Sequence, residues 1–296
     1  MNIGKLGIIL VNYNGKEYNE KCIQSILKST YKNFIIIVVD NDSKDGSYEE
    51  LENKFENEVI LIKSQDNLGF SVANNIGIKK GIELGCSYFM LLNNDTVISE
   101  TLIEEMFKVA KNKVIVSPKI YYCDEPKKIW SAGSGVNWKK GLPYQLGIDQ
   151  MDDGNYDNLQ LVPCATGCCL LFNKQLIKDI GYLSDEYFLY YEDTDYTVKA
   201  VKYGYDIIYQ PKAVLWHKVS ASIGGEESEN YIYYNTRNRL LFNDRFNNEN
   251  KTYYMTYFYL TRLLKCIKWI LKGRKYLVKA TIEGIKDYKD GVVGKR

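Results

Sequence analysis

Three acidic side chains lie within four residues of one another, at Glu192, Asp193 and Asp195. They come directly before an apolar pattern with helical spacing, which predicts a helix from Glu192 to Tyr203 that ends at Gly204. Backbone N–H groups and the helix dipole favour an ionised carboxylate in a first helical turn. Such a carboxylate can take a proton from an attacking hydroxyl. The alternative is that the three acids only stabilise the start of the helix.

Four apolar runs alternate with helical patterns in the first half of the chain. They lie at residues 6–11, 34–39, 59–62 and 88–92 and are rich in β-branched or aromatic residues. Continuous apolar runs are typical of parallel strands buried on both faces, and the alternation predicts βαβ units. Parallel strands end at one edge of their sheet, where ligands bind. The polar residues that follow each run therefore predict a shared site.

Those polar residues supply candidates for binding a nucleotide. Asp40 and Asp42 follow the second run, and a carboxylate there can accept hydrogen bonds from a pyrimidine N3–H and from ribose hydroxyls. One alternative is a turn that leads into the next helix. Another is a calcium loop at residues 41–52, although no amphipathic helix precedes it. The other candidates at this edge are Asn12, Tyr13, Asn67, Gly69, Asn74, Asn93, Asn94 and Asp95.

The second half of the chain has shorter and less regular patterns. We expect an irregular or antiparallel β region over residues 119–162 that covers a cleft, with Trp130 and Thr166 as candidates to contact an acceptor. A buried strand is expected at 163–172, and a short helix is expected at 174–180. Two short strands are expected at residues 207–209 and 214–216.

Two further segments hold candidates for the site. His217 follows the last of these strands, and a single histidine in that place is either a packed residue or a metal ligand. Arg237 or Arg239 could pair with a diphosphate through its two-pronged guanidinium, and a solvated or structural arginine is equally favoured. The glycine-containing stretch at 222–228 is a candidate lid over a ligand.

Composition limits the class of protein. The chain has 296 residues, 45% hydrophobic and 26% charged, which is ordinary for a globular protein and excludes a disordered or collagen-like one. No apolar run approaches the ~20 residues that span a bilayer, and the apolar stretch near the start is short for a signal peptide. Seven scattered cysteines and one histidine favour reduced thiols in a cytoplasmic protein over a zinc site.

Positive charge is concentrated in the last 46 residues. Residues 251–296 hold twelve Lys or Arg and three acids, a net charge of +9, which leaves −7 for residues 1–250 because the whole chain carries +2. Between 254 and 275, apolar and basic residues lie mostly on different faces of a predicted helix. A basic amphipathic helix with aromatic residues predicts attachment to a membrane surface. Dimerisation or packing on the domain is the alternative, and nucleic acid binding is not expected.

Taken in order, the motifs resemble those of a known family. The sequence resembles family 2 glycosyltransferases of the GT-A fold, in the bacterial rhamnosyltransferase-like branch, over about residues 5–240. The motifs are Ile9-Leu-Val-Asn-Tyr-Asn14, Val38-Val-Asp-Asn-Asp-Ser43, Asn67-Leu-Gly-Phe70, Asn74-Asn-Ile-Gly77, Leu91-Leu-Asn-Asn-Asp-Thr96, Thr166-Gly167, Phe188-Leu-Tyr-Tyr-Glu-Asp-Thr-Asp195 and Leu215-Trp-His217. Each motif is weak by itself, and the ordered set is specific.

The resemblance implies roles for particular residues. Asp193 would be the catalytic base, with Glu192 and Asp195 orienting the acceptor or supporting the helix start. Asp40 would bind the nucleoside. Asp95 and His217 would hold Mn²⁺ or Mg²⁺ at the donor diphosphate. Asn93 stands where the family usually has the first acid of an Asp-x-Asp motif, which weakens the expected metal site.

We therefore expect a mixed, mostly parallel α/β sheet with a helical C-terminal extension. The expected domain is residues 1–240, with a nucleotide-binding half at 1–117 and an acceptor half at 118–240, and the extension is 241–296. The expected activity is inverting sugar transfer from dTDP-L-rhamnose or a UDP-hexose to a cell-surface or lipid-linked saccharide, on the cytoplasmic face of the membrane. A non-catalytic binding protein and, less favoured, a sugar nucleotidyltransferase are the alternatives.

Overall fold

A computed structural model describes residues 4–219 and 227–296, so most of the stretch considered as a lid lies outside the described residues. One mixed sheet of ten strands organises the chain, with the main strand order β10-β12-β6-β11-β4-β1-β2-β3. Its strands are β1 (Leu6–Asn12), β2 (Phe34–Asp40), β3 (Val59–Lys63), β4 (Tyr88–Asn93), β5 (Thr96–Ile98), β6 (Val114–Tyr122), β7 (Ile129–Ser131), β10 (Gln160–Leu161), β11 (Cys169–Asn173) and β12 (Asp206–His217). A separate hairpin pairs β8 (Ser134–Asn137) with β9 (Leu142–Gln145).

The four predicted strands of the first half form the parallel part of the sheet. β1 pairs in parallel with β2 and β4, and β2 pairs in parallel with β3. Ile8 and Leu10 pack into the core on one face of the sheet, whereas Ile9 packs into the core on the other face. Burial on both faces explains why this strand has a continuous apolar run rather than alternating polarity.

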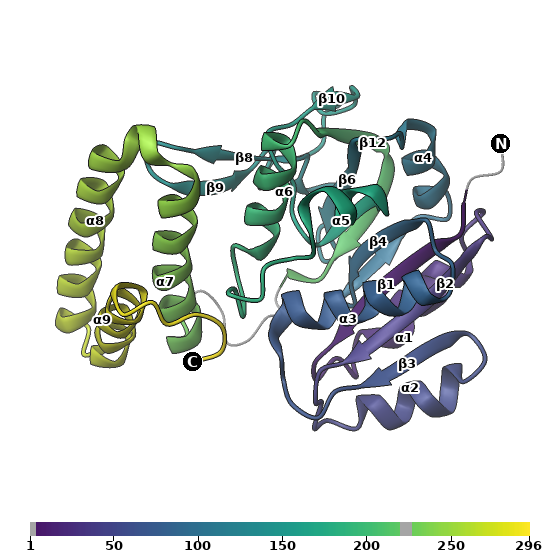
Figure 1. Ribbon diagram of the computed structural model, residues 1–296, viewed down its shortest axis with the longest axis horizontal. Helices are drawn as coiled ribbons and strands as arrows, with labels where there is room; N and C mark the ends of the chain where they lie inside the picture. Colours follow the sequence, from purple (N-terminus) through teal and green to yellow (C-terminus); the bar gives the residue numbers. More distant parts are fainter. Residues whose placement is uncertain (1–3, 220–226) are drawn as a thin grey trace.

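Helices cover both faces of the sheet (Figure 1). Residues of α1 (Asn19–Leu27), α2 (Ser47–Phe55) and α4 (Leu102–Val109) join one core cluster. Residues of α3 (Gly69–Glu83), α5 (Gln175–Ile180) and α6 (Glu192–Lys202) join the other cluster. Each helix buries its apolar stripe against the sheet, as the helical spacing predicts.

The second half differs from the sequence expectation in three places. Of the strand expected at 163–172, only the second part is a strand, β11, which begins at Cys169. Residues 163–168 form a loop that enters the site. The two short strands expected at 207–209 and 214–216 are one strand, β12, with an irregular register between Gln210 and Val214. The region 119–162 is antiparallel β structure as expected, but β6 begins before it and pairs in parallel with β12.

The C-terminal part forms a helical layer beside the sheet (Figure 1). It consists of α7 (Glu229–Phe246), a short 3-10 helix (Asn248–Asn250), α8 (Lys251–Leu271) and α9 (Lys275–Lys289). The expected single amphipathic helix at 254–275 is divided, because Gly273 has a φ of 71° between α8 and α9. α7 continues through residue 240 without a break, so the expected boundary falls inside a helix. Within residues 4–219 and 227–296, no helix has the length and apolar character needed to cross a bilayer.

Candidate active site

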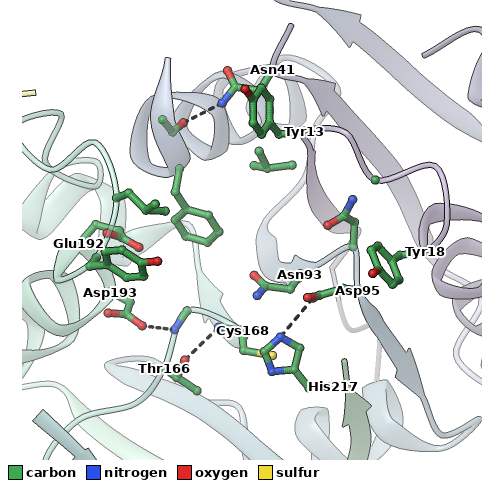
Figure 2. A pocket seen from close by; sticks show the side chains of 18 of the residues that line it. Tyr13, Tyr18, Asn41, Asn93, Asp95, Thr166, Cys168, Glu192, Asp193 and His217 are labelled. Atoms are coloured by element: carbon green, nitrogen blue, oxygen red, sulfur yellow. Dashed lines mark hydrogen bonds and ion pairs between the residues drawn. The ribbon is translucent and has the colours of Figure 1, made fainter. Parts of the chain in front are cut away.

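A cleft of about 310 Å³ opens at the carboxyl ends of the parallel strands, between the first half of the chain and the start of α6 (Figure 2). Most of the candidate residues line it, although they come from both halves of the sequence. The candidates in its walls are Tyr13, Asn67, Gly69, Asn93, Asn94, Asp95, Trp130, Thr166, Glu192, Asp193 and His217. Asn12, Asp40, Asp42, Asn74, Asp195 and Arg237 are not among the lining residues.

Asp193 lies on the wall of the cleft formed by the start of α6. Its Oδ2 accepts a hydrogen bond of 2.7 Å from the backbone N–H of Gly167. Its Oδ1 accepts from the backbone N–H of Thr194, at 2.6 Å, and from the Thr194 hydroxyl, at 3.1 Å. These hydrogen bonds hold the carboxyl group in one orientation at the edge of the cleft.

Glu192, the neighbouring acid, is in a different environment. It is buried, and its Oε2 has no hydrogen-bond partner among the described residues. Burial, and secondarily the charge of Asp193, raise the pKa of Glu192 from 4.5 to about 8. A carboxyl group with that pKa is mostly protonated at neutral pH and can donate a hydrogen bond. The two adjacent acids therefore lie in different environments.

An unusual backbone conformation positions both acids. Tyr190 and Tyr191 have φ values of 69° and 76°, in the left-handed region that bulky residues rarely adopt. Such a conformation costs on the order of 1–3 kcal/mol and persists only where the surroundings fix it. Here Tyr191 is buried against Phe242, and the carbonyls of Leu189 and Tyr190 accept hydrogen bonds from Asn238. The turn ends one residue before Glu192 and sets the direction in which α6 begins.

Asp95 and His217 meet on the opposite wall, as Figure 2 shows. His217 Nε2 lies 3.1 Å from Asp95 Oδ1, and both side chains are buried. The residues lie far apart in the chain, but β5 pairs with β12 and brings Thr96 opposite His217. The ring of Trp130 packs edge-on against the imidazole at 4.7 Å. Trp130 therefore holds the histidine in place at this end of the cleft.

These two side chains fit a divalent cation. Asp95 Oδ1 and both ring nitrogens of His217 are buried and form no hydrogen bond of acceptable geometry within the part of the chain that the structure describes. Buried polar atoms of this kind call for an explanation, and a bound ion is one. Among the described residues, no cluster of three or more His, Cys, Asp or Glu side chains could hold a metal. Two protein ligands would leave most coordination positions to a ligand phosphate and water.

The loop that begins α3 forms another part of the cleft. Gly69 has a φ of 81°, and a Cβ atom there would lie 2.4 Å from the carbonyl oxygen of Phe188. Asn41 Nδ2 donates to Asn67 Oδ1 at 2.9 Å, and Asn41 Oδ1 accepts from the backbone N–H of Leu68 at 2.9 Å. Asn41 thus braces this turn, and glycine permits its close approach to Phe188.

Asn12 and Asp40 lie beneath the cleft rather than in its wall. Both are fully buried, and Asn12 Nδ2 donates to Asp40 Oδ2 at 2.6 Å. Asn12 also donates to Ser47, and its Oδ1 accepts from Asn19 at 2.8 Å. Asp40 Oδ1 accepts from the backbone N–H of Ser43. These hydrogen bonds occupy the polar atoms of both side chains and join the loop after β1 to the loop after β2.

Four more candidates lie away from the cleft. Asp42 pairs with Lys44 on the surface, and Asn74 donates to the carbonyl of Phe70 within α3. Asp195 accepts from the Tyr187 hydroxyl at 2.9 Å and pairs with Arg245 at 3.1 Å. Asp195 therefore anchors α6 to α7.

Arg237, the fourth, is buried in the helical layer. Its guanidinium donates to Asn238 Oδ1 and to the carbonyl of Glu186, and it packs over the rings of Tyr233 and Tyr234. These contacts hold the Arg237 side chain within the helical layer, outside the lining of the cleft. Arg237 instead links α7 to the segment before α6.

Several lining residues were not among the candidates. Tyr18, Asn41, Phe70, Phe188 and Cys168 all line the cleft. Asn41 follows β2 directly and could have been selected by position alone. Tyr18 and Cys168 follow no pattern that marks them, because the loops that carry them reach the cleft only through tertiary packing.

Comparison with known proteins agrees with this geometry. The family model described as Glycosyl transferase family 2 matches residues 7–181. A low-salt glycan biosynthesis hexosyltransferase from Haloferax volcanii is 28% identical over 240 residues, covering 80% of this chain and 74% of the relative. A poly-beta-1,6-N-acetyl-D-glucosamine synthase from Staphylococcus aureus is 24% identical over 270 residues, covering 91% of this chain. The chain spans 63% of the length of that synthase, less than two thirds.

Solved structures support the fold. GalNAc-T7, solved with UDP, GalNAc and Mn²⁺, superposes with a TM-score of 0.61 at 14% identity, over 80% of this chain and 48% of its own. The mannosyltransferase PcManGT from Pyrobaculum calidifontis, in complex with GDP-Man and Mn²⁺, superposes with a TM-score of 0.59 at 13% identity, over 96% of this chain and 88% of its own. These likenesses show a GT-A fold. Because the family model covers more than half of the sequence, the chain belongs to glycosyl transferase family 2 and is a glycosyltransferase of the GT-A fold.

Proposed function

We propose that this protein moves a sugar from a nucleoside diphosphate donor to an acceptor hydroxyl by a single displacement with inversion. The observation that carries the proposal is the arrangement of the cleft in Figure 2, with Asp193 on one wall and the Asp95–His217 pair on the other. A base and a place for the leaving diphosphate are the two things that an inverting displacement needs. The reacting sugar would lie between them.

In this mechanism Asp193 takes the proton of the acceptor hydroxyl as its oxygen attacks the anomeric carbon. The bond from that carbon to the diphosphate oxygen breaks, and the nucleoside diphosphate leaves with the electron pair. The hydrogen bonds from Gly167 and Thr194 keep the carboxylate directed at one point. Protonated Glu192 can donate to a hydroxyl of the acceptor, which adds orientation without a second negative charge.

Asp95 and His217 would hold Mn²⁺ or Mg²⁺, which neutralises charge on the departing diphosphate. Asn93 offers an amide where a second carboxylate would bind a hard cation more tightly, so the donor phosphates would supply much of the affinity. Tyr13, Asn41, Asn67 and Asn94 line the remaining wall and would contact the nucleoside. The favoured donors are dTDP-L-rhamnose and UDP-hexoses, as the sequence resemblance implies.

The acceptor would be a saccharide of a cell-surface or lipid-linked glycan. The names of the two curated relatives, a glycan biosynthesis hexosyltransferase and a poly-N-acetylglucosamine synthase, are in keeping with a saccharide acceptor. We also propose that α8 attaches the enzyme to the inner face of the membrane, because its outer side exposes Leu260, Leu263, Leu264, Ile267 and Leu271 next to lysines. A second copy of the chain is the competing occupant of this surface.

The decisive experiment measures donor binding and donor hydrolysis against UDP-, dTDP- and GDP-sugars, each with Mn²⁺, Mg²⁺ or EDTA. We expect turnover of one pyrimidine donor. Asp193→Asn should lower kcat by about a thousandfold and leave the donor Kd within about threefold, because it removes the base and not the donor contacts. Asp206→Asn, an exposed acid at the start of β12, is the matched control and should retain activity.

One alternative has a specific observation in its favour. Asn93 removes a carboxylate from the place where a metal would bind, as expected of a protein that binds nucleotide sugars without catalysis. Donor binding with no turnover, in the presence of lipid-linked and free saccharide acceptors, would support this alternative. Equal turnover by the wild type and Asp193→Asn would instead assign the base to another group.

A further inference from the structure

A second pocket, of about 340 Å³, lies between α7 and α8 and is separate from the catalytic cleft. Four basic side chains line it: Arg239 from α7, and Arg262, Lys265 and Lys268 from α8. Aromatic rings, including those of Tyr231 and Trp269, complete the wall. Among the described residues of its lining the acid is Glu227, which is paired with Arg274. This part of the lining therefore holds more basic than acidic side chains.

Arg262 is the unusual residue in this pocket. The residue is only 8% exposed, and its Nε is buried with no hydrogen-bond partner among residues 4–219 and 227–296. Among the described residues, no carboxylate forms an ion pair with Arg262 or Arg239. Arg239 instead donates to the carbonyls of Gly141 and Lys140, and Arg262 packs over the ring of Phe258 at 5.6 Å. Burial, and next the charge of Arg239, lower the pKa of Arg262.

A buried cation without a partner is costly unless a ligand supplies the missing charge. A guanidinium has a planar set of donors that matches the oxygens of a phosphate group. Two neighbouring arginines with two lysines at the rim are suited to an anion of more than one negative charge. Inorganic phosphate, a phosphate ester and a diphosphate share this chemistry.

The pocket lies beside the wall of the cleft that holds Asp193. Tyr191 lines the pocket and directly precedes Glu192. The ring of Tyr190, which lines the cleft, contacts the ring of Tyr231 at 5.1 Å. The pocket thus adjoins the Asp193 side of the cleft, whereas Asp95 and His217 lie on the opposite wall. A bound anion would be on the acceptor's side of the reaction.

The surface beside the pocket is apolar. Leu264 and Leu271 are 66% and 83% exposed on α8 and lie within one helical turn of Lys268, which lines the pocket. Helical geometry places these residues on adjoining faces of α8. A charged group in the pocket could therefore carry a hydrocarbon chain that leaves over the exposed apolar face.

We propose that the pocket between α7 and α8 binds the diphosphate of a lipid-linked saccharide acceptor, with Arg262 and Arg239 on the phosphate oxygens and the lipid along α8. The attached saccharide would extend past Tyr190 and Tyr191 toward Asp193. This inference rests on the proposed function, since it names the acceptor class of the same reaction.

The test measures the binding of inorganic pyrophosphate and of farnesyl diphosphate to the full chain in EDTA, without a donor. We expect farnesyl diphosphate to bind at least about tenfold more tightly than pyrophosphate, because its chain buries apolar surface. Arg262→Gln should weaken both by at least about tenfold. Lys272→Gln, which removes the same charge at the residue that follows α8 and does not line the pocket, should change them by less than about twofold.

Several outcomes would overturn the proposal. Equal affinities of Arg262→Gln and the wild type, or displacement of the probes by nucleotide, would place the diphosphate elsewhere. Equal affinities of the two probes would remove the lipid as the source. Wild-type donor turnover is measured separately, so its absence would count against the proposed function while diphosphate binding still tests the pocket.

A second variant separates binding from structure. Arg262→Met removes the unpaired charge and keeps most of the apolar packing, so its Tm without ligand should equal or exceed that of the wild type. Pyrophosphate should raise the Tm of the wild type and leave that of Arg262→Met unchanged. A lower Tm for Arg262→Met would assign Arg262 a structural role instead.

Discussion

At the residue scale, two neighbouring acids of the site, Asp193 and Glu192, lie in different environments. Asp193 is surrounded by N–H and O–H donors, whereas the adjacent Glu192 is buried with one oxygen unpartnered. Burial raises the pKa of Glu192, so its environment favours a neutral carboxyl group. A carboxyl group held in one orientation and a neutral hydrogen-bond donor thus lie next to each other at the start of one helix.

The raised pKa of Glu192 predicts a pH-dependent stability. The folded protein holds this proton up to a pKa of about 8, whereas the unfolded chain releases it near 4.5. The free energy of unfolding that Glu192 contributes is therefore complete below about pH 4.5 and is lost as the pH rises toward 8. Glu192→Gln should become steadily more stable relative to the wild type from about pH 5 to pH 8 in urea unfolding. Glu249→Gln, at an exposed position, should show no such trend.

The metal site gives a second prediction at this scale. Asn93→Asp adds a carboxylate beside Asp95, so the Mn²⁺ concentration for half-maximal activity should fall by about tenfold. Asp95→Asn removes a ligand and should raise that concentration by at least about tenfold. Activity that is insensitive to EDTA and to both substitutions would exclude a metal held by Asp95 and His217. Electron paramagnetic resonance of bound Mn²⁺ gives a readout that does not depend on turnover.

At the scale of elements, the cleft exists because turns at strand and helix ends meet closely. α3 begins at Gly69, whose Cα faces the carbonyl of Phe188 before α6. α6 begins after the left-handed pair Tyr190–Tyr191, which Asn238 of α7 holds through two carbonyls. The start of α3 and the segment before α6 are therefore in direct backbone contact beside the cleft.

Two glycines at the ends of α3 allow that contact to be tested. Gly69 and Gly85 have φ values of 81° and 80°, so alanine costs similar backbone strain at both. A Cβ at Gly69 would meet the Phe188 carbonyl, whereas a Cβ at Gly85 meets nothing within 4 Å. Gly85→Ala should cost about 1 kcal/mol of unfolding free energy, and Gly69→Ala should cost at least about 1 kcal/mol more and weaken donor binding. Equal losses in chemical denaturation would show that the contact is not tight.

At the scale of the whole molecule, the basic helical extension is docked on the catalytic body. The end of the chain donates a backbone hydrogen bond from Gly294 to Glu186, and Lys295 pairs with Asp66 at 2.7 Å. α9 packs on α7 at Gly284, where a Cβ would lie 2.8 Å from the Tyr233 carbonyl. α8 is then left with an outer apolar side, and this is the surface that we propose for the membrane.

Vesicle binding tests that surface with two leucines of equal exposure. Leu264 on α8 and Leu161 on β10 are both 66% exposed. Leu264→Glu should weaken binding to anionic phospholipid vesicles by at least about tenfold, because it puts a charge into the apolar face and loses leucine burial. Leu161→Glu should have no effect, and salt should weaken wild-type binding. If Leu264→Glu instead dissociates a dimer in sedimentation experiments, a second copy covers α8.

The sequence by itself determined the parallel half of the fold and most of the cleft. Runs such as residues 34–39 are apolar on both faces, which predicts buried parallel strands. Because parallel strands end at the same edge of their sheet, the polar residues that follow them share that edge. The acids at 192–195 predicted a helix start, because negatively charged side chains are favoured at the positive end of the helix dipole. Local chemistry was enough for these features.

Only the tertiary structure decided which polar residues line the cleft. Asp40, Asp42, Asn74, Asp195 and Arg237 lie outside its lining, and their partners, such as Asn12 for Asp40 and Arg245 for Asp195, come from other parts of the chain. The same packing paired β5 with β12 to join Asp95 to His217, and it buried the Nε of Arg262 with no hydrogen-bond partner in the described part of the chain. A sequence specifies which groups can bond, but burial and long-range pairing decide which of them are already occupied and which remain free for a ligand.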